Sequence, residues 1–141
     1  MAIKRQHHTH RFERGSHRLT QVLFITPEYN RSVPGGLKNA IDVGSRPYGK
    51  GALIGKPAAI ISSSPGPIGG FGSNHAIRQS LVFLNMPVLQ QPEAYLGHIK
   101  NSFDDAGRLT SESLKNLLSN FIAAFEQLIA QSKSKEKCSF W

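Results

Sequence analysis

Two short apolar runs, each of strand length and each bounded by turn residues, constrain the fold of this chain most strongly. Residues 22–25 read Val-Leu-Phe-Ile and are followed at once by Pro27, and residues 58–61 read Ala-Ala-Ile-Ile between a Gly-Lys-Pro turn and a run of serines. A run that is apolar on both faces is typical of a strand in a parallel sheet that helices cover on both sides. We predict a third, shorter strand at Val88-Leu89, after Pro87.

Apolar residues at helical spacing fall between and after these runs. The first set is Leu37, Ala40 and Ile41, which follows a Pro-Gly-Gly start, and the second is spaced i, i+4, i+7 at Ile77, Leu81 and Leu84. The longest set forms one helical stripe, made of Leu114, Leu117, Leu118, Phe121, Ile122, Phe125, Leu128 and Ile129. Either Thr110 or Ser111 is the expected N-cap of that last helix.

The order strand, helix, strand, helix, strand, helix predicts an α/β fold with right-handed crossovers and a parallel sheet. Residues 22–25 are too apolar for an edge strand, because an unpaired apolar edge is open to unwanted pairing. We therefore expect another strand on the far side of this one, and the sequence before it offers none.

The net charge of +8 lies mainly at the two ends of the chain. Residues 21–131 carry nine Lys and Arg against seven Asp and Glu. We therefore divide the chain into a disordered, basic, His-rich tail at 1–20, a domain at 21–131 and a basic C-terminal tail at 132–141. A nearly balanced domain argues against nucleic-acid binding by the body of the protein.

Other functional classes are disfavoured by what the sequence contains. His7, His8 and His10 have no fold around them that would close a metal site, so we expect no bound metal. No apolar run approaches the ~18 residues of a membrane helix. The one cysteine, Cys138, cannot form an internal disulfide, which fits a cytoplasmic protein.

The segment after the first apolar run carries the residue types of a binding site. It has a rigid entry at Pro27, a flat aromatic at Tyr29, an amide at Asn30 and a charge pair formed by Glu28 and Arg31. Ligands of an open α/β sheet bind beyond the carboxyl ends of the strands, where this segment falls. We predict that it forms a ligand-binding loop.

The segment after the second run, residues 62–72, is rich in glycine. Glycines would let a flat ring lie against the backbone. The spacing matches neither the dinucleotide fingerprint nor the phosphate-binding P-loop. Taken alone, this segment is equally well explained as a flexible connection.

Together the two segments resemble the NAD(P)H-dependent FMN reductases, and most closely the bacterial chromate and quinone reductase type. The resemblance rests on residues 26–42 (Thr-Pro-Glu-Tyr-Asn-Arg-Ser-Val-Pro-Gly-Gly-Leu-Lys-Asn-Ala-Ile-Asp), 55–57 (Gly-Lys-Pro), 64–70 (Ser-Pro-Gly-Pro-Ile-Gly-Gly), 77–79 (Ile-Arg-Gln) and 92–93 (Pro-Glu). It covers about residues 22–130. It implies a flavodoxin-like, three-layer α/β/α fold with FMN at the carboxyl ends of the strands.

The resemblance also implies a set of site residues. Those bordering the isoalloxazine ring would be Pro27, Glu28, Tyr29, Asn30 and Arg31, with Ser64, Pro65 and Gly66 contacting the ring from the next loop. Reduced nicotinamide, NADH or NADPH, would pass a hydride to FMN, and a quinone, a flavin or a metal oxyanion such as chromate would be reduced. Because the cofactor carries the chemistry, we assign no catalytic residue. The resemblance further implies a homo-oligomer, dimeric or tetrameric.

The family pattern begins with a strand and a Gly-Ser-Leu-Arg type phosphate loop, and residues 1–20 contain neither. We therefore expect an incomplete flavodoxin-like domain that keeps the ring half of the site and lacks the phosphate half. The alternative hypothesis is a non-catalytic module that associates with itself or with an intact paralogue. A third hypothesis is a basic protein that binds its partners through the two tails.

Overall fold

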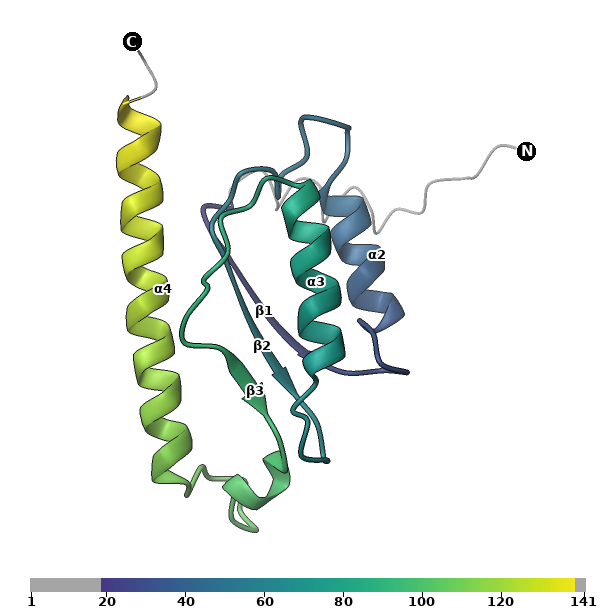
Figure 1. The fold of residues 1–141 in the computed structure, drawn as a ribbon, viewed down its shortest axis with the longest axis vertical. Coiled ribbons are helices and arrows are strands. Elements are labelled where there is room, and N and C mark those ends of the chain that lie inside the picture. Colours follow the sequence, from purple (N-terminus) through teal and green to yellow (C-terminus); the bar gives the residue numbers. More distant parts are fainter. Residues whose placement is uncertain (1–18, 139–141) are drawn as a thin grey trace, which may run out of the picture.

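The computed structural model describes residues 19–138, and its centre is a sheet of three parallel strands (Figure 1). The elements follow one another along the chain as β1 (Val22–Pro27), α2 (Gly35–Gly44), β2 (Ala58–Ser63), α3 (Phe71–Phe83), β3 (Ala94–Leu96), the 3-10 turn η1 (Ile99–Ser102) and α4 (Glu112–Cys138). The strands lie in the order β1-β2-β3, and both pairs are parallel. The predicted α/β architecture is confirmed.

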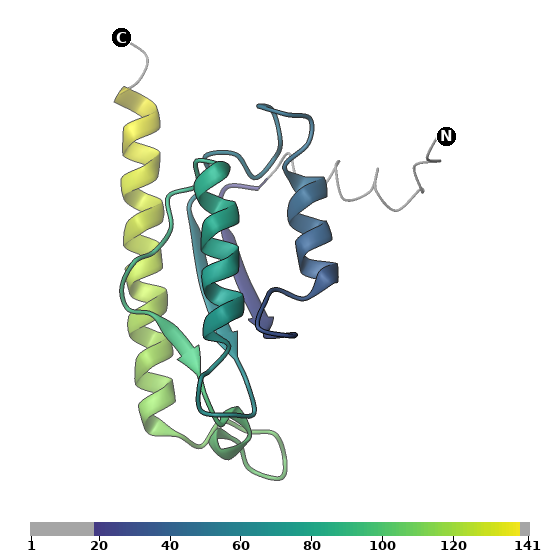
Figure 2. The ribbon, with the colours of Figure 1, turned by 45° about the vertical axis from the view of Figure 1, so that its right-hand side comes forward.

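Alternate side chains of β2 build the two halves of the core. Ala58 and Ile60 pack with residues of α2 and α3 on one face of the sheet. Ala59 and Ile61 pack with α4 on the other face. All four are buried, so β2 is covered on both sides as its apolar run predicts. Figures 1 and 2 show the resulting layers, with α2 and α3 on one side of the sheet and α4 on the other.

The third strand lies elsewhere than predicted. Val88 forms only an isolated parallel bridge with Ala58, and the Leu89 N–H donates to the Ala58 carbonyl at 2.9 Å. The continuous ladder with β2 begins only at Ala94. Pro92, which lies between these two points, has no N–H to donate to a ladder. The prediction at Val88-Leu89 is therefore wrong in position, because this part of the chain touches β2 twice and pairs continuously only on the second approach.

The prediction that the first strand is covered on both faces is wrong for one face within residues 19–138. Leu23 and Ile25 point to the α4 side of the sheet, and they remain 37% and 68% exposed. The reason is the position of α4, whose Phe121 and Phe125 pack over β2 and β3. Among the described residues β1 is also an edge strand, with β2 as its one neighbour.

The predicted helical stripe of α4 is confirmed except at Ile122, which is 41% exposed. Leu114, Phe121 and Phe125 are buried, and the Leu114 N–H donates to Ser111 Oγ at 3.3 Å. Ser111 is therefore the N-cap, one of the two candidates. The helix continues to Cys138, through part of the segment predicted as a tail at 132–141. The predicted tail at 1–20 falls almost wholly outside the described residues, so the division of the chain stays a prediction.

We predict that Phe121→Ala lowers the free energy of unfolding by about 3–5 kcal/mol, because it leaves a cavity under α4 where the ring is 1% exposed. The matched control is its neighbour Ile122, which is 41% exposed, and Ile122→Ala is expected to cost less than about 1 kcal/mol. Urea denaturation measures both values. Equal losses for the two variants would contradict the way α4 faces the sheet.

Candidate functional site

The two predicted loops start from adjacent strand ends. Pro27 at the end of β1 lies in register with Ser63 at the end of β2. A second link joins the end of β1 to α3, where Thr26 Oγ1 is 3.4 Å from Ser73 Oγ in the first turn of the helix. Thr26 and Ser73 are both buried. The sheet therefore brings the loop after β1 and the loop after β2 together at one edge, as the parallel topology requires.

The first loop closes in a tight two-residue turn. Tyr29 and Ser32 exchange backbone hydrogen bonds, at 3.0 Å from the Tyr29 N–H and 2.9 Å from the Ser32 N–H. The central residues have positive φ, 49° at Asn30 and 64° at Arg31. A non-glycine residue such as Arg31 adopts this conformation at a cost, and such strain clusters at binding sites. The turn leaves the Tyr29 ring 62% exposed at the carboxyl end of β1.

Glu28 joins the first loop to α3. Its Oε2 accepts a hydrogen bond from the Ser73 N–H at 3.2 Å, and its Oε1 lies 3.7 Å from Arg31 Nη1. The side chain is only 11% exposed. A carboxylate at a helix N-terminus is stabilised by the unpaired N–H groups and the helix dipole. Glu28 therefore caps the N-terminus of α3.

Internal hydrogen bonds and a close approach shape the second loop. Ser64 Oγ accepts from the Gly69 N–H at 3.0 Å and donates to the Gly66 carbonyl at 2.9 Å. A Cβ added at Gly69 would lie 2.5 Å from the Tyr95 carbonyl carbon, so this glycine lets the loop lie directly on β3. Pro65 lies on the exposed outer side of the loop. The Ser64 hydroxyl is thus used inside the loop.

The eight predicted flavin residues divide into two groups. The structure places five of them on the exposed surface of the two loops: Pro27, Tyr29, Asn30, Arg31 and Pro65. The other three, Glu28, Ser64 and Gly66, are partly buried, and each takes part in hydrogen bonds within the protein. The structure therefore brings the loops together, and contact of these residues with a flavin stays a prediction.

Sequence reasoning missed a polar and aromatic cluster beside the second loop. The Tyr95 hydroxyl donates to Glu93 Oε1 at 2.8 Å and lies 3.0 Å from His75 Nε2, and the Phe71 and His75 rings stack at 4.0 Å. Burial, followed by the hydrogen bond to the Glu93 carboxylate, raises the pKa of Tyr95 to about 12. The spacing of Phe71 and His75, four residues apart on α3, is the one sequence signal that could have indicated half of this cluster.

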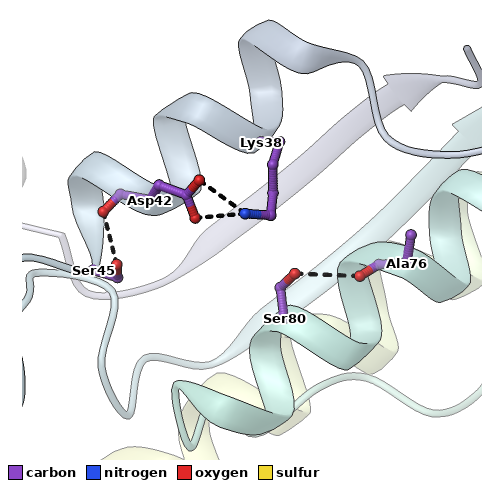
Figure 3. Close-up of polar contacts among 5 residues, drawn as sticks. All are labelled: Lys38, Asp42, Ser45, Ala76 and Ser80. Atoms are coloured by element: carbon purple, nitrogen blue, oxygen red, sulfur yellow. Dashed lines mark hydrogen bonds and ion pairs between the residues drawn. The ribbon is translucent and has the colours of Figure 1, made fainter.

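Three cavities of the described region lie away from the predicted loops. One of about 250 Å³ lies between α2 and α3, and it includes Lys38, Asp42, Ser45 and Ser80. Figure 3 shows that these polar groups bond within their own helices, with the Lys38 Nζ 2.7 Å from Asp42 Oδ1 and the Ser80 hydroxyl donating to the Ala76 carbonyl. These four polar side chains are engaged within the protein, so the cavity is a weaker candidate than the loops.

Residues 19–138 contain neither a metal-binding cluster nor a membrane-spanning helix. That part of the chain brings no three His, Cys, Asp or Glu side chains together in a way that could hold a metal ion. None of its helices is both long and apolar enough to cross a membrane. His7, His8 and His10 lie outside the described residues.

The known proteins that resemble this chain are named as FMN or quinone reductases. The sequence model of the NADPH-dependent FMN reductase family matches residues 4–101. A quinone reductase of Pseudomonas putida is 56% identical over 124 residues, which are 88% of this chain and 66% of the relative. A 2-hydroxy-1,4-benzoquinone reductase of a Burkholderia species is 42% identical over 101 residues, or 72% of this chain and 55% of that protein. The chain thus spans two thirds or less of the length of these relatives.

A solved structure extends the likeness to the fold. FerB, a flavoenzyme NAD(P)H:(acceptor) oxidoreductase from Paracoccus denitrificans, superimposes with a TM-score of 0.82 and 36% identity. The superposition covers 92% of this chain and 71% of FerB. The predicted flavodoxin-like fold is confirmed by this neighbour together with the parallel sheet.

We predict that Gly72→Ala destabilises the junction between the two loops. An added Cβ would lie 2.5 Å from the Arg31 carbonyl oxygen and 2.9 Å from Glu28 Oε2, so the backbone must shift. The expected cost is about 1–3 kcal/mol of unfolding free energy. Gly36→Ala is the matched control, because a Cβ there meets nothing within 4 Å and alanine favours helix. A Gly72→Ala protein as stable as Gly36→Ala in urea would contradict the close approach.

Proposed function

The chain belongs to the NADPH-dependent FMN reductase family, and from that premise we propose that it binds FMN across its two loops and reduces a quinone with electrons from NAD(P)H. The observation that carries the proposal is the Glu28–Ser73 hydrogen bond, which fixes the turn after β1 against the start of α3, directly after the glycine-rich loop. A preformed, exposed surface built from both loops suits a flat ligand. The quinone is proposed because the relatives are named for quinone reduction.

The exposed apolar side chains at this edge support a flat aromatic ligand. Tyr29 of the first loop is 62% exposed, Ile68 of the second loop 49%, and Phe71 at the start of α3 47%. Aromatic surface that is left open beside a few polar groups is typical of a small-molecule site. Each of these side chains would lose exposed area under a bound ring.

The residues of the chain would position and charge-stabilise the cofactor. The Tyr29 ring would lie against the isoalloxazine, and the amide of Asn30 has both a donor and an acceptor for its polar edge. Arg31, whose side chain is 75% exposed, would place a positive charge near the ring where negative charge develops on reduction. FMN, when bound, supplies the hydride-accepting chemistry.

The finer parts of the proposal rest on the family resemblance. They are reduction of a free flavin or of a metal oxyanion such as chromate in place of a quinone, assembly into a homo-oligomer, and a cytoplasmic location. The cytoplasm supplies reduced nicotinamide, and the single cysteine needs no oxidising compartment.

We predict that the purified chain quenches the fluorescence of FMN on titration and oxidises NADPH only when FMN and a benzoquinone are both present. The quench reports binding without any turnover, so a failure of binding and a failure of chemistry are told apart. No quench at a large excess of protein, with the fold intact by circular dichroism, would contradict the flavin proposal.

We further predict that Tyr29→Ala weakens FMN binding by roughly tenfold, since stacking of an aromatic ring is worth about 1–1.5 kcal/mol. Tyr48→Ala is the matched control, because Tyr48 is also a largely exposed tyrosine, at 76%, and it lines a different cavity beside Arg46. If the two variants bind FMN with equal affinity, Tyr29 does not contact the flavin.

The second candidate function is a non-catalytic association module. The observation that favours it is the exposed apolar face of β1, where Leu23 and Ile25 lie open. Exposed apolar side chains on an edge strand are typical of protein–protein contact. Purified protein that neither quenches FMN fluorescence nor runs as a monomer on size exclusion would favour this candidate.

A further inference from the structure

Phe71, the first residue of α3, is held in place by neighbouring rings. The Phe71 and His75 rings stack with their centroids 4.0 Å apart and their planes 28° apart. The two residues are four apart in the helix, so their side chains leave it on the same face. Tyr95 approaches from β3, with its ring centroid 5.3 Å from that of Phe71. Phe71 is still 47% exposed, so a ring that packs on two others keeps surface for a ligand.

Two hydrogen bonds fix the ring on which Phe71 stacks. A carboxylate can only accept, so the Tyr95 hydroxyl gives its one proton to Glu93 Oε1 at 2.8 Å. The Tyr95 oxygen therefore accepts from the Nε2–H of His75, 3.0 Å away. This chain, from His75 to Tyr95 to Glu93, fixes both the tautomer and the orientation of the imidazole.

The sheet and the glycine-rich loop hold Tyr95 in turn. Ala94 and Leu96 pack against α4, so Tyr95, which lies between them in β3, projects to the α3 side of the sheet. A Cβ added at Gly69 would lie 2.5 Å from the Tyr95 carbonyl carbon, so the loop lies directly on this residue. Phe71 is thus positioned before any ligand arrives, and a preformed contact loses little side-chain freedom on binding.

Phe71 also adjoins the junction of the two loops. A Cβ added at its neighbour Gly72 would lie 2.5 Å from the Arg31 carbonyl oxygen, and the next residue, Ser73, donates its N–H to Glu28. Figure 1 shows that α3 starts at the end of the sheet where β1 and β2 finish. The exposed surface of Phe71 therefore lies at the edge of the sheet that carries the proposed flavin site.

We propose that Phe71 selects the electron acceptor, by stacking its exposed surface on a flat, uncharged quinone. The inference rests on the proposed function, which supplies the quinone, and it adds the residue that recognises it. A flat, uncharged ring gains from stacking on a phenyl ring. A metal oxyanion gains nothing from that surface, because it is bound by cations and N–H donors. Phe71 is thus a specificity-determining residue, and His75 and Tyr95 are its positioning residues.

The charges beside these rings favour an uncharged ligand. Glu93 is exposed, and its carboxylate next to the Tyr95 hydroxyl would repel an anion. The positive charge of Arg78 is already engaged within the protein, since its Nε donates to Asn74 Oδ1 at 3.0 Å and its Nη1 donates to the Leu89 carbonyl at 3.3 Å. The surroundings of Phe71 therefore suit a quinone better than chromate.

The first test measures NADPH oxidation by the FMN-loaded protein with duroquinone or with chromate as acceptor. Duroquinone has no unsubstituted ring carbon, so it does not add to the thiol of Cys138. Phe71→Leu keeps an apolar side chain and removes the ring. Its KM for duroquinone is expected to rise roughly threefold to tenfold, the value of one aromatic stack, with kcat unchanged. Its KM for chromate is expected to stay as in wild type.

Phe83→Leu is the matched control. Phe83 is also an exposed phenylalanine of α3, at 75%, and it lies at the other end of the helix. Neither KM is expected to change in this variant. An unchanged KM for duroquinone in Phe71→Leu, or an equal rise for both acceptors, overturns the proposal.

Tyr95→Phe tests the positioning role, because it removes only the hydroxyl that joins His75 to Glu93. The KM for duroquinone is expected to rise by less than in Phe71→Leu, while kcat and the affinity for FMN stay unchanged. If the KM of Tyr95→Phe equals that of wild type, the hydrogen-bond chain does not position Phe71, and that part of the proposal is wrong.

A last test separates this inference from the proposed function. The ring resonances of Phe71, His75 and Phe83 are followed by NMR while duroquinone is added to the unmodified chain, without FMN or NADPH. Shifts at Phe71 and His75 but not at Phe83 are expected, because the quinone contacts the first stack alone. No shift at Phe71 overturns the inference even if FMN binds. A failure of FMN to bind contradicts the proposed function and leaves this result standing.

Discussion

The hydrogen bond from the Ser73 N–H to Glu28 is the interaction on which the candidate site depends. It joins a turn that follows β1 to a helix that follows β2, and so it converts two separate loops into one surface. This hydrogen bond is strengthened by its surroundings. The Glu28 side chain is only 11% exposed, and its negative charge lies at the N-terminus of a helix, where the helix dipole stabilises it. The close approach of Gly72 to the Arg31 carbonyl belongs to the same junction, since any side chain there would push the loops apart.

This junction presents the candidate site as a surface formed by the two loops. Two cavities of the described region lie elsewhere, one between α2 and α3 and one beside α4. The loop residues instead form an open surface with Tyr29 and Phe71 partly exposed. An open surface of aromatic and polar residues is consistent with a flat ligand. The comparisons place the chain in the NADPH-dependent FMN reductase family. The ring of FMN is a flat ligand of the kind that such a surface suits.

Much of the fold could be predicted from local patterns, and the failures have physical reasons. The stripe from Leu114 to Ile129 gave α4, because burial of one helix face requires that spacing. The third strand lies at Ala94–Leu96 and not at Val88-Leu89, since pairing there depends on a distant strand and leaves little trace in the local sequence. The role of Glu28 was likewise hidden, because a contact to Ser73, forty-five residues away, is a property of the folded chain. Tyr95 and His75 meet for the same reason.

The most direct test of the central claim is amide hydrogen exchange in Glu28→Ala, with no ligand added. If Glu28 holds the loops together, exchange at the Ser73 amide and across residues 64–72 becomes faster than in wild type, while exchange in the buried part of α4 around Phe121 is unchanged. Unchanged exchange at Ser73 would contradict the account, because the two loops would then be held by the sheet alone.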